Sequence, residues 1–238
     1  MKEQYVGDVN DYRKYALLRL LARSGLRLGV CWMLTRDDAS GHGNKLGYLD
    51  LPKQEAHDPE LHAIMRTVRE TPRGQRLGTI EASGVLARAI YFNEIVPEAL
   101  FERQLWFRRA GAALANTDLI FFDPDNGIEV RATPKGRKRS SKYVYHDELR
   151  ATYAAGHSLL VYQHFPMKER ASFIQTLARD LHSGAPGAEI WAILTSNVVF
   201  MLAIQQRHRP ALSQAAHHVL ETADPSFLHA QLIAPANP

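Results

Sequence analysis

The chain has 238 residues, of which 45% are hydrophobic and 23% charged, and its formal net charge is +4 at pH 7. This length fits one α/β domain, residues 1–238, and the single cysteine, Cys31, excludes an internal disulfide. No window approaches the roughly 18 apolar residues of a membrane-spanning helix, and the opening stretch MKEQYVGDVNDYRKY lacks the apolar centre of a secretory signal. We therefore expect a cytoplasmic protein with no membrane partner. The positive charge permits nucleic-acid binding without establishing it.

The first predicted elements are a helix and a buried strand. In residues 9–23, apolar side chains recur every three or four positions, which is helical spacing, and Asn10 or Asp11 is expected to cap the helix. The run LRLGVCWML, residues 26–34, predicts a buried strand that leads into the glycine-bearing loop TRDDASGHGNKLG. A second helix is predicted over residues 59–69.

The middle of the chain is less regular. Residues 85–95, VLARAIYFNEI, suit either a strand or a helix. Pro97 suits the first turn of a helix that continues to residue 115, and the run LIFF at residues 119–122 predicts a central strand.

The second half alternates strands with helices. Helices are predicted over residues 145–155, 167–182 and 210–221, and strands over residues 157–165, 188–195, 198–204 and 227–233. This alternation predicts a doubly wound, Rossmann-like α/β fold, in which helices cover both faces of a mostly parallel sheet. The two strands around the turn Ser196-Asn197 predict an antiparallel C-terminal edge.

The stretch LIFFDPDNG carries the first candidate site. Ligands of open α/β sheets bind outside the carboxyl ends of the strands, and Asp123, Pro124, Asp125 and Asn126 follow the LIFF strand directly. A carboxylate at that position can accept hydrogen bonds from an amine or hold a metal ion, so we interpret these four residues as catalytic. The same residues also suit an ordinary turn completed by Gly127.

A strand that ends in Asp-Pro resembles the [DN]-P-P-[YFW] motif of S-adenosylmethionine-dependent methyltransferases that modify adenine amines in RNA or DNA. In that family the first residue and the proline carbonyl accept hydrogen bonds from the target amine, and the aromatic residue stacks on the base. The resemblance implies that Asp123 accepts the amine beside Pro124, with S-adenosylmethionine as the cofactor and a nucleic acid as the partner.

The motif is degenerate here, because Asp125 and Asn126 stand where the family has its second proline and its aromatic residue. An aromatic side chain would have to come from elsewhere in the chain. Phe165, Tyr143 and Tyr145 are the candidates.

Two further resemblances concern other parts of the chain. The start GDVNDYRKYALLRLLA resembles the first segment of bacterial ribosomal-RNA adenine methyltransferases, a family that binds its cofactor at a G-x-G loop. By that resemblance Gly41 and Gly43 would bind the cofactor, although glycines at this spacing also suit a flexible loop. The full pattern DPDNG, with LIFF before it and SKY after it, also resembles a bacterial family with a DPDNG signature and no assigned activity.

A basic segment follows the acidic turn. Residues 131–142 contain six basic residues and no acidic one, and the proline, glycine and serines among them predict a flexible loop. Such a loop can neutralise phosphates or remain merely solvated. The candidate substrate-binding residues of this loop are Arg137, Lys138, Arg139 and Lys142. His164 and Phe165 join them as candidates, because they end a predicted strand at the same sheet edge as the acidic turn.

These features leave three hypotheses. The first is methyl transfer from S-adenosylmethionine to an exocyclic amine of a nucleic acid. The second is a metal-dependent nuclease or phosphoesterase, in which Asp123, Asp125 and Glu129 hold Mg²⁺ or Mn²⁺. The third is non-catalytic polyanion binding on a degenerate methyltransferase fold. The sequence does not indicate an oligomeric state.

Overall fold

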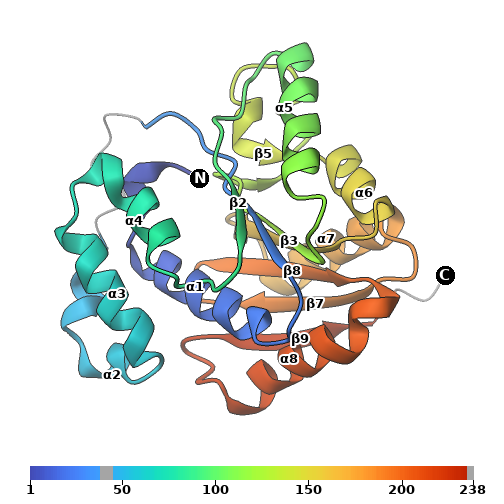
Figure 1. Ribbon diagram of the computed structural model, residues 1–238. Coiled ribbons are helices and arrows are strands. Elements are labelled where there is room, and N and C mark those ends of the chain that lie inside the picture. The colour runs from blue at the N-terminus through green and yellow to red at the C-terminus, as the bar shows by residue number, and fades with distance from the viewer. Residues whose placement is uncertain (38–44, 235–238) are drawn as a thin grey trace.

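The computed structural model describes residues 1–37 and 45–234, and these form helices around a seven-stranded sheet (Figure 1). The strands of the sheet are β1 (Leu28–Cys31), β2 (Ile90–Phe92), β3 (Leu119–Phe122), β6 (Ser158–His164), β7 (Glu189–Leu194), β8 (Val198–Ile204) and β9 (His229–Ile233). A separate parallel pair is formed by β4 (Gly127–Ile128) and β5 (Tyr143–Val144). The helices are α1 (Val9–Ala22), α2 (Pro52–Glu55), α3 (Pro59–Glu70), α4 (Arg76–Ala82), α5 (Leu100–Ala113), α6 (His146–Ala154), α7 (Arg170–Gly184) and α8 (Arg209–Thr222).

The strand order of the sheet is β2-β1-β3-β6-β8-β7-β9. The first four strands of this order pair in parallel, whereas β8 pairs antiparallel with both β6 and β7, and β9 pairs antiparallel with β7. The prediction of a Rossmann-like α/β fold with an antiparallel C-terminal edge is therefore confirmed. The parallel strands read as continuous apolar runs because helices cover both of their faces.

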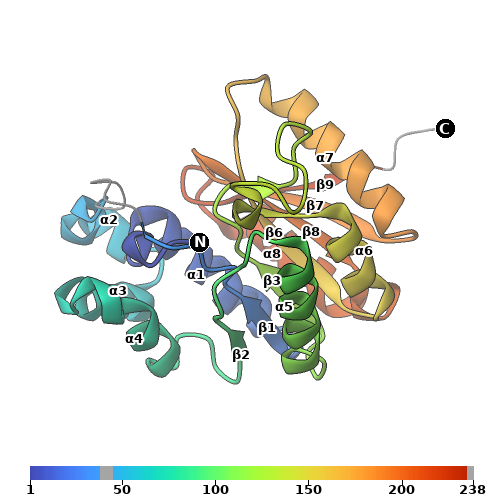
Figure 2. The same ribbon diagram turned by 90° about the horizontal axis from the view of Figure 1, so that it is seen from above.

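Alternation along each strand separates two layers of the core. In β3 the side chain of Phe121 packs in the cluster that contains α1 and α8, whereas Ile120 and Phe122 pack in the cluster that contains α5, α6 and α7. Figure 2 shows α1 to α4 on one side of the sheet and α5, α6 and α7 on the other. Within the described parts of the chain, no helix combines the length and apolarity needed to cross a membrane.

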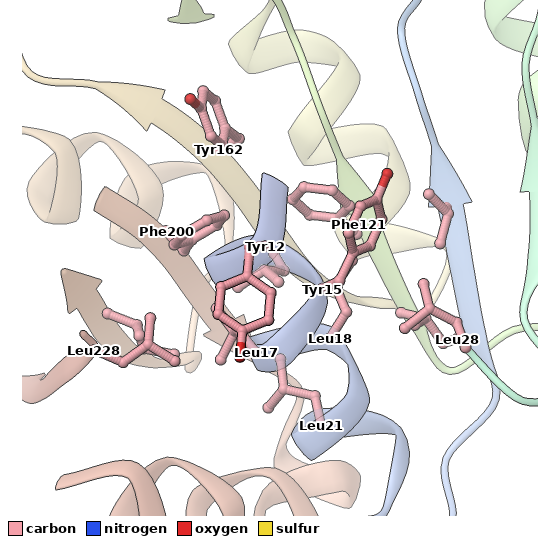
Figure 3. Packing of buried hydrophobic residues seen from close by; sticks show 14 of the residues in the cluster. Tyr12, Tyr15, Leu17, Leu18, Leu21, Leu28, Phe121, Tyr162, Phe200 and Leu228 are labelled. Carbon is pink, nitrogen blue, oxygen red and sulfur yellow. The ribbon is translucent and has the colours of Figure 1, made fainter. Parts of the chain in front are cut away.

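Helix α1 is buried along much of its length, with its aromatic and leucine side chains packed against β3, β8 and the segment before β9 (Figure 3). Its N-terminal cap is Asp8, whose carboxylate accepts from the backbone N–H groups of Asn10 and Asp11 at 2.8 and 3.0 Å. The expectation that Asn10 or Asp11 caps the helix is wrong. Because α1 begins at Val9, both residues lie inside its first turn and their side chains are available for other contacts.

Two helix starts differ from the prediction, and the structure decides between the two alternatives for one ambiguous segment. Helix α5 begins at Leu100 rather than at Pro97, and α7 begins at Arg170, because the Glu169 carboxylate caps it by accepting from the backbone N–H groups of the next turn. Residues 85–95, which suited a strand or a helix, contain β2. The short helices α2 and α4 were not predicted, since segments of four and seven residues carry too little periodicity.

Candidate functional site

The chain changes direction across the sheet between β1 and β3. From β1 it proceeds to β2 on one side and then returns to β3 on the other, which places a topological switch point between the carboxyl ends of β1 and β3. The amino group of Met1 lies there and donates to the carbonyl oxygens of Trp32, Met33 and Asp123 at 3.3, 2.8 and 2.8 Å. Polar groups therefore converge at the position where this class of fold binds ligands.

A pocket of about 760 Å³ opens at this edge of the sheet. Its volume lies within the range of small-molecule sites, roughly 300–1,000 Å³. The predicted site residues that line it are Asp123, Pro124, Asp125, Asn126, Lys142 and His164. The other lining residues are Met1, Lys2, Tyr5, Asp8, Asn10, Asp11, Lys14, Lys45 and Tyr162. The fold thus brings together the acidic turn, the end of the basic segment and the end of β6, which are separated in the sequence.

The Asp123 carboxylate forms a buried ion pair at the pocket floor. Its Oδ2 lies 2.8 Å from Nζ of Lys14, which also contacts Oδ1 of Asp11 at 2.6 Å. The side chains of Lys14 and Asp123 are only 1% and 3% exposed. Desolvation lowers the pKa of Lys14, but the carboxylates of Asp11 and Asp123 outweigh it, so its pKa is raised and the ammonium stays charged. Burial raises the pKa of Asp11 to about 6 against the opposing effect of Lys14.

This ion pair changes the role that the methyltransferase resemblance implies for Asp123. The carboxylate already accepts a hydrogen bond from the Lys14 ammonium, and the carbonyl oxygen accepts one from Met1. An amine from a substrate would have to displace Lys14 to reach the carboxylate. In the conformation described here, Asp123 organises the pocket floor, and the groups open to a ligand lie farther along the turn.

Asn126 carries the group that stays open, whereas Asp125 is already paired with the basic segment. Nζ of Lys142 lies 3.2 Å from Oδ2 of Asp125, and the backbone N–H of Asn126 donates to the Lys142 carbonyl at 2.9 Å. The pairing of β4 with β5 holds this contact in place. It sets Gly127, in the turn directly after Asn126, opposite Tyr143, the residue directly after Lys142. The carboxamide of Asn126 forms no hydrogen bond with any residue that the structure describes.

Gly127 allows the turn to approach β6. Its φ is +130°, and a Cβ added there would lie 2.2 Å from Oε1 of Gln163. That same oxygen accepts a hydrogen bond from the backbone N–H of Ile128 at 2.8 Å. The glycine of the DPDNG pattern is therefore required both by its backbone conformation and by the Gln163 side chain that holds the turn.

Asn10 is a pocket residue that the sequence reasoning assigned only to helix capping. It lines the pocket from the first turn of α1, and its Oδ1 is buried without a hydrogen-bond donor among residues 1–37 and 45–234. A buried acceptor without a partner is costly, and such groups in folded proteins are commonly satisfied by water or a ligand. The local sequence GDVND gave no signal for this role, since every polar residue there also suits a helix start.

The aromatic side chains of the pocket are not the predicted ones. Tyr5 and Tyr162 line it, whereas Phe165, Tyr143 and Tyr145 do not. Phe165 follows His164 in the strand direction and points to the opposite face, where its ring packs against Phe173 with centroids 6.3 Å apart. Alternation along the strand explains why only one of two adjacent candidates reaches the pocket.

His164 lies at the pocket mouth, where its side chain is exposed, and its Nε2 is 3.3 Å from the hydroxyl of Tyr162. Enough protein surrounds the ring for desolvation to lower the pKa of His164, although the carboxylates of Asp125 and Asp123 oppose this. The imidazole is therefore neutral at pH 7 and offers a hydrogen-bond donor and an acceptor to a ligand.

The basic segment is divided between the pocket rim and the surface. Arg137, Lys138 and Arg139 are exposed, do not line the pocket and form no ion pair with a described residue. The backbone N–H of Arg139 donates to the Glu98 carboxylate at 2.5 Å. These three cations therefore lie outside the pocket and have no acidic partner in the described part of the chain.

The alternative metal site is not assembled. Among the described residues, no three histidine, cysteine, aspartate or glutamate side chains come together in a way that could hold a metal ion. The Glu129 carboxylate instead accepts from the backbone N–H of His146 at 2.8 Å and does not line the pocket. The predicted cofactor-binding residues Gly41 and Gly43 lie outside the described residues, and Lys45, shortly after them, lines the pocket.

No protein-family model matches the chain, and no curated protein matches its sequence.

Proposed function

We propose that the chain is a methyltransferase-like enzyme that uses S-adenosylmethionine to methylate an exocyclic amine of a nucleic acid. The observation that carries this proposal is the pocket at the switch point, in which the Asp123 turn, Lys142 and His164 converge at the carboxyl ends of β3 and β6. The fold alone does not specify a reaction, so the proposal rests on the chemistry of the lining groups.

The pocket suits the polar groups of S-adenosylmethionine. The unpartnered Oδ1 of Asn10 can accept a hydrogen bond from an ammonium or a ribose hydroxyl, and Asp8 adds a carboxylate beside it. Lys45 supplies a cation for a carboxylate group. When bound, the cofactor supplies the methyl group, and these residues orient it.

The amine acceptor in this proposal is Asn126 rather than Asp123. The carboxamide oxygen of Asn126 is free of hydrogen bonds from the described part of the chain, and Asp125 lies next to it in the turn. A hydrogen bond from an exocyclic amine to the Asn126 carboxamide oxygen would orient the nitrogen lone pair, which is the nucleophile, so no proton-abstracting base is needed before attack. Tyr5 offers a ring on which a base can stack.

Calorimetric titration tests the proposal. We expect S-adenosylmethionine and its demethylated product S-adenosylhomocysteine to bind with dissociation constants between about 1 μM and 1 mM, the usual range for enzyme ligands. Mg²⁺ and Mn²⁺ should bind weakly or not at all, since the carboxylates of Asp11, Asp123 and Asp125 are already paired with lysines. Absence of heat with both adenosyl ligands at about 1 mM would contradict the proposed activity.

A second candidate function is non-catalytic polyanion binding, and the buried Lys14–Asp123 ion pair favours it. In that case the acidic turn is structural, and the unpaired cations of the 131–142 segment do the binding. Both candidates predict nucleic-acid binding, but only the first predicts binding of the adenosyl ligands.

Neutralising the exposed cations tests the binding surface common to both functions. Replacing Arg137, Lys138 and Arg139 by alanine should weaken binding of single-stranded oligonucleotides and reduce the slope of log K against log salt by about 2, since each lost phosphate contact contributes about 0.7–0.9. The measurement is fluorescence anisotropy at several salt concentrations.

A matched control removes three exposed cations elsewhere, namely Arg66, Arg73 and Arg179, and so changes the net charge equally. Equal loss of affinity in the two triple variants would show that general charge, not this segment, attracts the polyanion.

A further inference from the structure

The basic segment, residues 131–142, lies against the start of helix α5 (Figure 1). The backbone N–H of Arg139 donates to the Glu98 carboxylate at 2.5 Å, just before the helix begins. A Cβ added at Gly136 would lie 3.3 Å from the Cβ of Leu100, the first residue of the helix. The segment is therefore packed on α5 and is not a flexible loop.

The backbone of the segment has a defined conformation. Arg139 adopts a φ of +69°, in the left-handed region that residues with a side chain rarely occupy. Such a conformation persists only where the surrounding contacts determine it. Here the Glu98 carboxylate accepts from the N–H of Arg139, and the buried Arg103 guanidinium donates to the carbonyl oxygen of Ser140 at 3.0 Å. A fixed backbone reduces the ordering that the segment has to undergo when it binds a ligand.

An exposed aromatic ring lies in the same turn of α5. Phe101 directly follows Leu100 and is 65% exposed, although phenylalanine is among the residues most often buried. Leu100 is half exposed beside it. A single exposed apolar residue needs no explanation, but this ring adjoins a segment with three exposed cations that lack an acidic partner in the described part of the chain, namely Arg137, Lys138 and Arg139.

The combination of a ring with unpaired cations fits a strand of nucleic acid that has unpaired bases. Phosphates pair with arginine and lysine side chains, and the face of an unpaired base stacks on an aromatic ring whatever the base is. A duplex offers the same phosphates, but its bases are stacked inside and cannot reach the ring. Glu102 of α5 is also exposed here, and Arg131 adds a fourth exposed cation, so positive charge prevails. A second copy of this surface would carry the same charge and is the less complementary occupant.

We propose that Phe101 and the three cations form a platform that binds single-stranded nucleic acid, with an unpaired base on the ring and its neighbouring phosphates at the cations. The platform lies close to the pocket rim, because the 3₁₀ helix Ser140–Lys142 leads from Arg139 to the rim residue Lys142. These three residues rise about 6 Å, roughly the rise of two stacked nucleotides. The inference rests on the nucleic-acid partner of the proposed function, and it narrows that partner to unpaired strands.

Fluorescence anisotropy with a labelled single strand and with its fully paired duplex tests the platform. In the Phe101→Ala variant, affinity for the single strand should fall at least about fivefold, because stacking of one base on an aromatic ring contributes that factor or more. Affinity for the duplex should change by less than about twofold, because the cations remain. The melting temperature should stay within about 2 °C of the wild type, since the ring is largely exposed.

Three further variants define the contact. Phe101→Leu keeps an apolar side chain without a ring and should bind the single strand as weakly as Phe101→Ala, whereas Phe101→Trp should bind it at least as tightly as the wild type. The three native tryptophans are buried, so a change in emission of Phe101→Trp on binding reports the new indole. The matched control Leu220→Ala removes an exposed apolar side chain from α8 and should leave both affinities unchanged.

Absence of single-strand binding by the wild type, equal single-strand affinity of the wild type and Phe101→Ala, or an equal loss for strand and duplex would each overturn the proposal. Wild-type affinity in Phe101→Leu would also overturn it, as would a wild-type dimer that dissociates in Phe101→Ala while the affinity for the strand stays the same.

Titration of S-adenosylmethionine separates this proposal from the proposed function. Phe101 does not line the pocket, so Phe101→Ala should bind the cofactor with wild-type affinity. A wild type that binds strands through Phe101 but binds no cofactor would contradict the methyltransferase function and leave the platform in place.

Discussion

Replacing Lys14 by methionine should lower the free energy of unfolding by about 3–5 kcal/mol, measured by urea denaturation at pH 7.5. Methionine preserves the volume of the side chain, so the loss arises from charge. Without the ammonium, the carboxylates of Asp11 and Asp123 stay buried next to each other and uncompensated. The Lys53→Met variant removes a lysine from an exposed pair with Asp224, whose separation is 3.2 Å, and should lose less than about 1 kcal/mol.

The deficit of Lys14→Met should shrink as the pH falls. Burial already raises the pKa of Asp11 to about 6 in the presence of Lys14, and loss of the cation raises it further. A carboxyl group whose pKa is raised in the folded state favours folding below its unfolded pKa and loses that contribution as the pH rises through its folded pKa. The deficit should therefore shrink as the pH falls from 7.5 to 6, because over that range the folded variant binds a proton that the folded wild type has not yet bound. A deficit that is constant over this range would show that packing, not charge, determines the effect.

Replacing Arg103 by methionine should also lower the free energy of unfolding by about 3–5 kcal/mol, because the buried Glu148 loses its bidentate partner and keeps only Lys135, whose Nζ lies 3.3 Å from one of its carboxylate oxygens. The guanidinium contacts both carboxylate oxygens of Glu148 at 2.7 and 2.9 Å, and donates to the carbonyl oxygens of Ser140 and Tyr143 at 3.0 and 2.7 Å. It therefore attaches the end of the basic segment to α5 and α6. Lysine cannot reproduce this planar set of contacts, so Arg103→Lys should recover only part of the loss.

Limited proteolysis measures how the same substitution changes the local stability of the basic segment. Trypsin should cleave after Arg137 or Lys138 faster in Arg103→Met than in wild type, measured under conditions in which both remain globally folded. The control is Arg109→Met on the same helix, which removes an exposed pair with Glu94 and should change stability by less than about 1 kcal/mol. Equal cleavage rates in wild type and Arg103→Met would contradict the attachment.

Most of the fold could be predicted because its elements are periodic and local. The runs LIFF and VVFMLAI coincide with β3 and β8, and the helical spacing after Asp8 coincides with α1. Two predicted helix starts were wrong. Helix α5 begins at Leu100 rather than at Pro97, and α7 begins directly after its capping residue Glu169 rather than at Met167. Short helices such as α2 carry too few residues for a period to emerge.

The candidate site was predictable only in part. Asp123 follows β3 and His164 ends β6, and these two strands are parallel neighbours. Because the carboxyl ends of parallel strands meet at one edge of a sheet, the sequence could predict that both residues lie there. The Lys14 partner of Asp123 is 109 residues away, and nothing in a one-dimensional pattern pairs them. Strand alternation could have distinguished His164 from Phe165, whereas the contribution of Tyr5 depends on how the segment before α1 packs.

The central claim, that the switch-point pocket holds the cofactor, is tested most directly by titrating S-adenosylmethionine into wild-type protein and into the Asn10→Leu variant. Leucine preserves volume but removes the unpartnered acceptor, so affinity should fall about tenfold. The free energy of unfolding should not decrease, because an unsatisfied buried group is removed. Absence of binding to the wild type, or equal affinity for both proteins, would contradict the account.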